Sequence, residues 1–106
     1  MPAYVISEVR ITNRDAVERY KPLAAQAAAA YGGRYLARDA VPEALEGAFE
    51  PDERLVILQF DTIGQAHAWY ASDAYRQALD AARDGLARRL FIVEGTPAVD
   101  PTSCPG

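Results

Sequence analysis

The chain alternates between apolar and polar residues in several short segments, and this period of two is typical of β-strands. It is clearest in residues 3–11, 34–39, 54–60 and 89–94, and it is weak in residues 42–47. Two longer segments repeat apolar residues every three or four positions, which predicts helices over residues 14–31 and from residue 63 to about 86. Ser72 or Asp73 can re-cap the second helix after Tyr70, which divides it into two segments. The predicted order of elements is therefore β-α-β-(β)-β-α-β.

This order is typical of the ferredoxin-like split βαβ plan, in which an antiparallel sheet carries two helices on one face. We therefore predict an α+β fold. A chain of 106 residues has the length of one domain. We expect a single ferredoxin-like domain over residues 1–95, followed over residues 96–106 by a mobile tail that contains three prolines.

Short polar and glycine motifs mark the ends of the predicted helices. Thr12 and Asp15 are spaced like a capping box at the start of the first helix. Thr62 and Gln65 repeat this spacing at the start of the second. Gly32-Gly33 supplies a left-handed stop after the first helix, because glycine adopts that conformation without strain.

The two faces of the predicted sheet differ in composition. The face that we place beneath the helices is almost wholly apolar and carries Val5, Val9, Ile11, Val56, Leu58, Phe60, Phe91 and Val93. The opposite face mixes Tyr4, Ile6, Leu36, Leu55, Ile57, Leu90 and Ile92 with Glu8, Arg10, Gln59 and Glu94. A face left to water is polar at most positions, so we predict that a second copy of the chain covers this one. A monomer with a half-exposed sheet face is the alternative.

Composition excludes several classes of function. The net charge is −4 and the basic residues are scattered, which argues against a nucleic-acid partner. No apolar run reaches the ~20 residues that span a membrane. We also find no signal-peptide pattern and expect a cytoplasmic protein. Cys104 is the only cysteine and His67 the only histidine, so we expect no disulfide within the chain and no metal site. No phosphate-binding or dinucleotide motif occurs, and we expect no cofactor.

The candidate chemistry lies in aromatic residues on the predicted helices and on the turn that leaves the first helix. These candidates for ligand binding are Tyr20, Tyr31, Tyr35, Trp69, Tyr70 and Tyr75. They either fill the space between two alanine-rich helices, or line an apolar pocket with a few polar tips, as small-molecule pockets usually do.

His67 joins these aromatic residues as a candidate for ligand binding and as the candidate general base, because its ordinary pKa lies in the useful range. A surface or hydrogen-bonded structural histidine is the alternative. Glu8 and Glu94 are also predicted to lie on neighbouring strands of one face, near Arg10. An ion-pair network at the dimer interface explains that pair better than acid–base catalysis does.

Several segments together resemble a known family. They are 1–6 (Met-Pro-Ala-Tyr-Val-Ile), 31–36 (Tyr-Gly-Gly-Arg-Tyr-Leu), 45–47 (Leu-Glu-Gly), 69–75 (Trp-Tyr-Ala-Ser-Asp-Ala-Tyr) and 90–95 (Leu-Phe-Ile-Val-Glu-Gly). Their order and spacing resemble domain-of-unknown-function family 1330, in the dimeric α+β barrel superfamily, which is related to antibiotic-biosynthesis-type monooxygenases. The resemblance implies a ferredoxin-like protomer whose sheet packs against its mate's sheet. It implies no particular reaction, because function does not follow from fold.

Three functions are consistent with these observations. The first is a homodimer that binds a small apolar or aromatic metabolite between helices and sheet, without turnover. The alternative is a cofactor-independent monooxygenase or isomerase acting on a small aromatic or lactone substrate. There the substrate supplies the reactive carbanion, and His67 or a tyrosine moves a proton. The third is a purely structural dimer whose aromatic residues fill the core completely.

Overall fold

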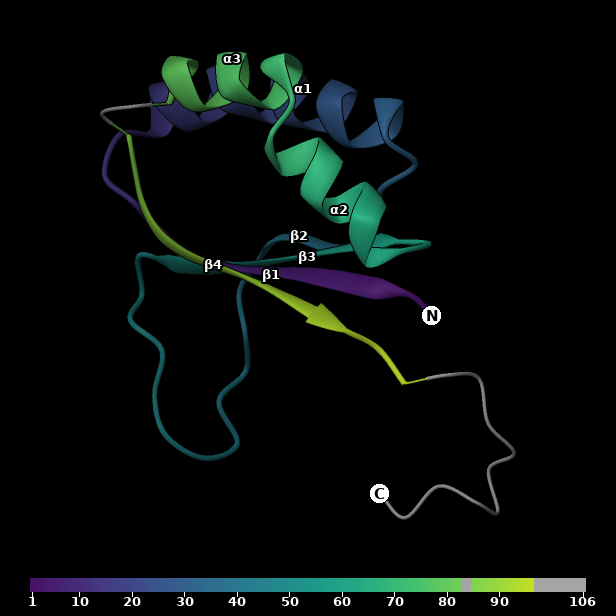
Figure 1. Ribbon diagram of the computed structural model, residues 1–106. Coiled ribbons are helices and arrows are strands. Elements are labelled where there is room, and N and C mark those ends of the chain that lie inside the picture. The colour runs from purple at the N-terminus through teal and green to yellow at the C-terminus, as the bar shows by residue number, and fades with distance from the viewer. Residues whose placement is uncertain (83–84, 97–106) are drawn as a thin grey trace, which may run out of the picture.

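The computed structural model describes residues 1–82 and 85–96, so the predicted mobile tail lies almost wholly outside the described residues. The elements are β1 (Ala3–Ile11), α1 (Arg14–Ala30), β2 (Arg34–Ala40), β3 (Glu53–Phe60), α2 (Ile63–Tyr70), α3 (Asp73–Ala81) and β4 (Leu86–Glu94). The strands form one antiparallel sheet in the order β2-β3-β1-β4. All three helices lie on one side of this sheet (Figure 1). The predicted α+β architecture is therefore confirmed.

One predicted strand and one predicted helix end are wrong. Residues 42–47 form no strand, and residues 41–52 are instead a long connection that runs on the side of the sheet away from the helices (Figure 1). Pro42, which cannot donate to a ladder, and Gly47, at φ 78°, both disfavour a paired strand there. The second helical segment is re-capped at Ser72, as predicted, but it ends at Ala81 and not near Leu86, which belongs to β4 and pairs with Ile11.

The helix starts follow from local hydrogen bonds. Thr62 caps α2 as predicted, since its hydroxyl accepts a bond of 3.1 Å from the Gln65 N–H. The first cap is Asn13 and not Thr12, because the Asn13 side-chain oxygen accepts bonds from the backbone N–H groups of Asp15 and Ala16. Asparagine is among the strongest N-cap residues, and here it takes the position itself.

The turn after α1 has the hydrogen bonds of a Schellman motif, as the predicted glycine stop requires. The Gly33 N–H donates to the Ala28 carbonyl at 2.8 Å, and Gly32 donates to Ala29 at 3.2 Å. Gly32 has a φ of 78°, which favours glycine. A Cβ on Gly33 would lie 2.6 Å from the Phe60 ring, so this position also needs glycine for close approach.

The strand register corrects the predicted faces of β4. Ile92 pairs with Val5 and Leu90 with Ser7, so both side chains face the helices and pack against the core. Phe91 and Val93 lie on the open face instead, where they are 41% and 44% exposed. The sequence from Leu90 to Val93 is apolar at four consecutive positions, and alternation alone therefore cannot tell its two sides apart.

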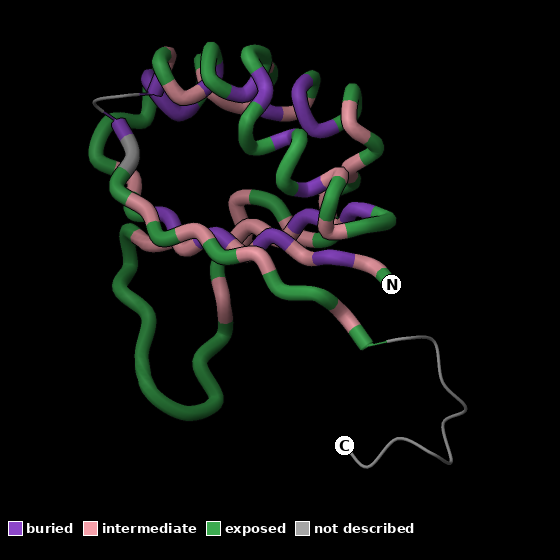
Figure 2. Tube along the Cα trace, in the orientation of Figure 1, coloured by how far each residue is buried: buried purple, intermediate pink, exposed green. Residues whose placement is uncertain are grey.

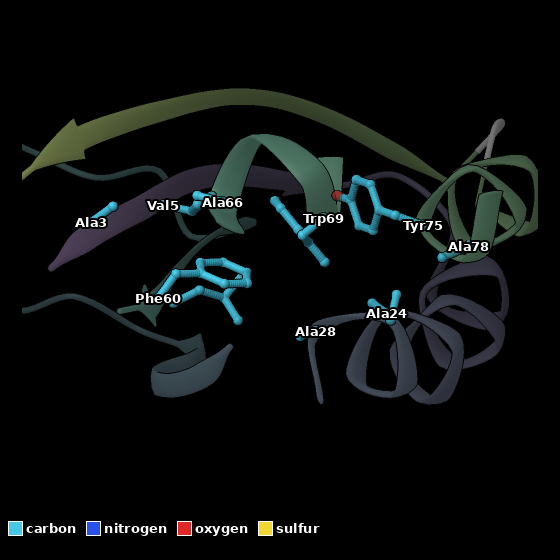
Figure 3. Close-up of a cluster of buried hydrophobic side chains, with 11 residues drawn as sticks. Ala3, Val5, Ala24, Ala28, Phe60, Ala66, Trp69, Tyr75 and Ala78 are labelled. Carbon is cyan, nitrogen blue, oxygen red and sulfur yellow. The ribbon is translucent and has the colours of Figure 1, made fainter. Parts of the chain in front are cut away.

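The core is built on small side chains around three aromatic rings. Figure 3 shows Trp69 between Phe60 and Tyr75, with ring centroids 5.5 Å and 4.2 Å away. Ala24 and Ala78 are both buried, which lets α1 and α3 lie side by side. By contrast α2 contacts the sheet directly, through β1, β3 and β4. The interior is therefore packed beneath α2 and less filled beneath the other two helices.

The open face of the sheet remains without a cover in the single chain. It carries Leu36, 53% exposed, on the edge strand β2, and Phe91 and Val93 on the opposite edge strand β4. The connection 41–52 adds Leu45, which is 89% exposed, and Phe49. Figure 2 shows nearly all of this connection as exposed.

Candidate functional site

A partly enclosed cavity lies between the sheet and helices α1 and α3. Its floor includes Ser7, Val9 and Leu90, and Tyr20 and Tyr75 reach it from the helix layer. Its volume is about 50 Å³. That is room for water, but less than the about 150 Å³ of an engineered apolar cavity that takes benzene. A ring-sized ligand therefore fits only if lining side chains move outward.

Two tyrosines and one arginine meet in the lining of this cavity. The Tyr20 and Tyr75 hydroxyl oxygens are 2.8 Å apart. The Arg88 Nη1 group donates to both, at 3.0 Å to Tyr20 and through a short bond to Tyr75. The guanidinium carbon lies 5.4 Å from the Tyr75 ring centroid and 5.8 Å from that of Tyr20. The three side chains thus join both helices to β4 through one polar contact.

The pKa values of Tyr75 and Arg88 are both raised. Burial raises the pKa of Tyr75 far above its ordinary value, so its hydroxyl stays protonated. Burial alone would lower the pKa of Arg88, but the Tyr20 and Tyr75 hydroxyls outweigh it, and the net direction is upward. Within the described part of the chain, no carboxylate pairs with Arg88. This part of the cavity therefore holds the Arg88 cation beside the protonated hydroxyl of Tyr75.

The sheet register explains how a second arginine comes near. Val9 pairs with Arg54 on β3 and with Arg88 on β4, so the three residues form a row across the sheet. Val9 faces the helices, and both arginines share that face. The next row, nearer the middle of β1, is Val56, Ser7 and Leu90. Charged side chains thus occupy the floor only at one end.

Two buried polar atoms of the lining have no partner among the described residues. They are the Ser7 hydroxyl oxygen and the Trp69 indole nitrogen Nε1. Ser7 is 5% exposed and Trp69 only 1% exposed. A buried polar group without a hydrogen bond costs about 1–3 kcal/mol. Both residues line the cavity, so a bound molecule can supply what they lack.

A second polar cluster, centred on Asp39 of β2, forms another part of the lining. Its carboxylate contacts Lys21 Nζ at 2.7 Å, Arg14 Nη2 at 2.9 Å and Arg54 Nε at 3.7 Å. Burial alone would raise the pKa of Asp39, but the hydrogen bonds from Lys21 and Arg14 and their charges lower it. Asp39 also has a φ of 49°, in the left-handed region that few side chains adopt. The site thus holds this carboxylate ionised.

The predicted site residues separate into two groups. Tyr20, Tyr35, Trp69 and Tyr75 all line the cavity. Burial raises the pKa of Tyr35, whose ring packs 4.7 Å from the Arg38 guanidinium carbon. The remaining three candidates do not line it: Tyr31 is half-buried against the core, and Tyr70 and His67 are exposed.

The position of His67 follows from the geometry of α2. This helix buries Ala66 and Trp69, which are three residues apart and share one face. His67 follows Ala66 by one position, about 100° around the helix, and is exposed. Its side chain is therefore poorly placed to act on a molecule in the cavity.

The predicted pairing of Glu8 with Glu94 is wrong. Glu94 pairs with Ala3, a helix-facing residue, whereas Glu8 is on the open face and contacts Arg89 Nη1 at 3.4 Å. Arg10 contacts Asp52 instead, at 3.4 Å. The register places the two glutamates on opposite sides of the sheet, so they form no catalytic pair.

Sequence reasoning missed Arg54, Arg88, Ser7 and Asp39. A signal was present for two of them. Arg54 continues the alternation of Val56 and Leu58, and Ser7 lies between Val5 and Val9. A polar residue at a position predicted to be buried is the more informative observation in any sequence. The role of Arg88 needed the register of β4, which the sequence did not resolve.

The described residues contain neither a metal-binding cluster nor a membrane-spanning helix. No group of three or more His, Cys, Asp or Glu side chains among these residues is placed to hold a metal ion. No helix within residues 1–82 and 85–96 is long and apolar enough to cross a membrane.

Comparison with known families now identifies the domain. The family model described as "Domain of unknown function (DUF1330)" matches residues 2–96. The chain belongs to this family. A search of curated proteins gives no match.

Solved structures with the same fold come from several bacteria. A protein of unknown function from Rhodopseudomonas palustris superposes with a TM-score of 0.70 at 14% identity, over 92% of this chain and 84% of that one. The cofactor-independent oxygenase SnoaB from Streptomyces nogalater gives a TM-score of 0.58 at 9% identity, over 92% and 96%. An antibiotic biosynthesis monooxygenase-like protein from Deinococcus radiodurans gives 0.60 at 21% identity, also over 92% and 96%. At these identities the similarity establishes the fold alone.

Proposed function

We propose that this DUF1330 domain binds a small, largely apolar or aromatic molecule between its helices and its sheet. The lining combines apolar floor residues such as Val9 and Leu90 with a few polar groups, which is typical of small-molecule sites. The observation that carries the proposal is the unpartnered Trp69 Nε1 at 1% exposure, together with the unpartnered Ser7 hydroxyl, both judged within the described residues. A fully closed structural core has no reason to keep both.

The cavity volume limits the class of ligand. At about 50 Å³ the cavity takes a flat ring only after a half-buried side chain such as Tyr35 moves outward. We therefore expect single-ring molecules to bind and large multi-ring molecules to be excluded.

Trp69 provides a direct assay, because it is the only tryptophan and lies on the cavity wall. Single-ring aromatic compounds added to the protein are expected to change its emission saturably and to raise the melting temperature. A Leu90→Phe variant fills the cavity without adding a second tryptophan and should abolish the saturable change. If emission does not respond to any single-ring compound, or responds equally in the filled variant, the proposal fails.

The protein is proposed to work as a homodimer joined through the open sheet face. This face presents Leu36, Phe91 and Val93 to water, and connection 41–52 adds Leu45 on the same side. An apolar surface of this kind marks an interface. Two-fold packing of two identical sheets covers this face in both copies of the chain.

Light scattering at micromolar concentration tests the dimer. We expect twice the chain mass for the natural protein and a single chain mass for Phe91→Asp, which puts a charge in the interface. Gln77→Asp adds the same charge on the exposed side of α3 and should remain dimeric. A monomeric natural protein would contradict the proposal.

A second candidate function is oxygenation or isomerisation without a cofactor. The Arg88 guanidinium and the Tyr20 and Tyr75 hydroxyls are suited to stabilise an enolate or phenolate, the form of substrate from which either reaction starts. In the oxygenase case the carbanion of an activated CH₂ group gives electrons to O₂. One oxygen atom becomes the carbonyl oxygen of the product, and the other leaves as water with the two hydrogens. The solved structures with this fold include a named cofactor-independent oxygenase.

An oxygen electrode distinguishes this candidate from simple binding. Phenols and lactones with an acidic C–H or O–H group are supplied to the purified protein in air. Turnover predicts oxygen consumption equal to product formed in the oxygenase case, or a shifted double bond without oxygen uptake in the isomerase case. If neither product forms when substrate is in large excess over protein, the enzymatic candidate fails and only the binding function remains.

A further inference from the structure

The cavity has an excess of hydrogen-bond donors over acceptors. A guanidinium has five N–H donors and no acceptor. In Arg88 the Nη1 group donates to the Tyr20 and Tyr75 hydroxyl oxygens, and its other N–H groups have no acceptor among the described residues. Trp69 Nε1 is also a donor only, and it too is unpartnered in that part of the chain.

The tyrosine pair adds one more donor. A single hydroxyl hydrogen suffices for the bond of 2.8 Å between Tyr20 and Tyr75. The hydrogen of the second hydroxyl has no acceptor in residues 1–82 and 85–96. What this end of the cavity lacks is therefore an acceptor, not a donor.

The charge of the cavity lining also favours a ligand that supplies hydrogen-bond acceptors. The lining contains four cationic side chains, Lys21, Arg38, Arg54 and Arg88, and one carboxylate, Asp39. That carboxylate is already held by Lys21, Arg14 and Arg54. The whole chain, in contrast, has a net charge of −4. A partly enclosed, low-dielectric site of one sign concentrates ligands of the opposite sign.

A purely structural role explains less of this arrangement. Two neutral hydroxyls are enough to join the helices, and the packed core around Phe60 and Trp69 needs no charge at all. Burying a cation without a counter-ion is unfavourable unless it meets an anion when the site is in use. Arg88 is positioned for this by its place beside Val9 on the floor of the sheet.

From these observations we infer that the ligand of this cavity is an anion with a planar, largely apolar body. Its negatively charged oxygen accepts hydrogen bonds from Arg88 and from the Tyr20–Tyr75 pair. A carboxylate matches the planar guanidinium best, because two parallel N–H···O bonds can form. This inference rests on the proposed function, that a small aromatic molecule binds between helices and sheet.

The test compares benzoate with benzamide, which have nearly the same size and shape but differ in charge. Each is titrated into the full chain while Trp69 emission is followed. Charge-assisted hydrogen bonds are the stronger ones, so benzoate is expected to bind at least about tenfold more tightly than benzamide. Arg88→Gln should remove this preference, and Arg88→Lys should keep part of it.

Arg89 supplies the matched control. It precedes the same apolar run, but its side chain is on the open face and 72% exposed, where it contacts Glu8. Arg89→Gln therefore removes the same charge without touching the cavity, and benzoate binding should not change. Circular dichroism and thermal melting establish that each variant is folded.

The four outcomes separate the claims. A benzoate preference lost only in the Arg88 variant supports the inference. Equal binding of benzamide and benzoate overturns the anion but leaves the proposed function intact. A preference that survives in folded Arg88→Gln overturns the assignment to Arg88. Binding of neither compound overturns this inference together with the single-ring ligand proposed above.

Discussion

The two halves of the sheet's helix-facing side differ although the same strands form both. The packed half lies beneath α2 and includes Ala3, Phe60 and Ile92, all buried or packed against the core. The hollow half lies beneath α1 and α3 and includes Arg54 and Arg88 beside a cavity. Along β3 and β4, the helix-facing side chain changes from apolar in the packed half to arginine in the hollow half. We therefore propose that stability resides mainly in the packed half and ligand recognition in the hollow half.

The largest expected effect comes from truncating the packed half. Phe60 is fully buried and touches the Trp69 ring and the Gly33 backbone, so Phe60→Ala leaves a void that small alanine neighbours cannot fill. We expect a loss of about 3–5 kcal/mol in the free energy of unfolding, measured by urea denaturation. A loss below about 1 kcal/mol would show that this half is not the stable one.

A smaller effect is expected in the hollow half. Tyr75→Phe keeps the ring against Trp69 but removes the hydroxyl that Arg88 and Tyr20 share. We expect a stability loss of about 1 kcal/mol, together with weaker benzoate binding. Tyr70→Phe is the control, because this half-exposed tyrosine does not line the cavity. Equal losses of stability and of benzoate binding in Tyr75→Phe and Tyr70→Phe would contradict a special role for the Tyr75 hydroxyl.

Acid should weaken the hollow half through Asp39, whose pKa is lowered in the folded state. A lowered folded pKa means that its contribution is complete above its unfolded pKa of about 3.9. That contribution is lost as pH falls through the lower folded value. Urea denaturation of natural protein and Asp39→Asn from about pH 6 to about pH 2.5 should show a stability difference that narrows on acidification. A difference independent of pH would contradict the ion-pair explanation.

The smallest expected effect is that of Ser7→Ala. The variant removes a buried hydroxyl that has no partner among the described residues, so stability should stay the same or rise by up to about 1 kcal/mol. Thermal melting and urea denaturation measure it. A clear loss of stability would mean that the Ser7 hydroxyl has a hydrogen-bond partner in solution. The hollow half would then have one fewer unpartnered polar group to offer a ligand.

The same contrast separates what the sequence could predict from what it could not. Local periodicity was enough to predict strands β1 and β3. It was also enough to predict that Tyr20 and Tyr75 lie on helices. The sequence could not predict which side chains of β4 face the helices, because residues 90–93 are all apolar. Only the pairing of β4 with β1 decides this. The same long-range pairing places Arg88 and Arg54 on either side of Val9. His67, chosen for its chemistry alone, lies outside the cavity.

The most direct test of the central claim, that the hollow half recognises an anion, is a crystal structure of the protein with benzoate. We predict density between the sheet and helices α1 and α3, with the carboxylate within hydrogen-bond distance of Arg88. The ring is expected near Trp69. Benzoate bound only outside this cavity, or a cavity filled by side chains with Arg88 bonded to protein acceptors, would contradict the account.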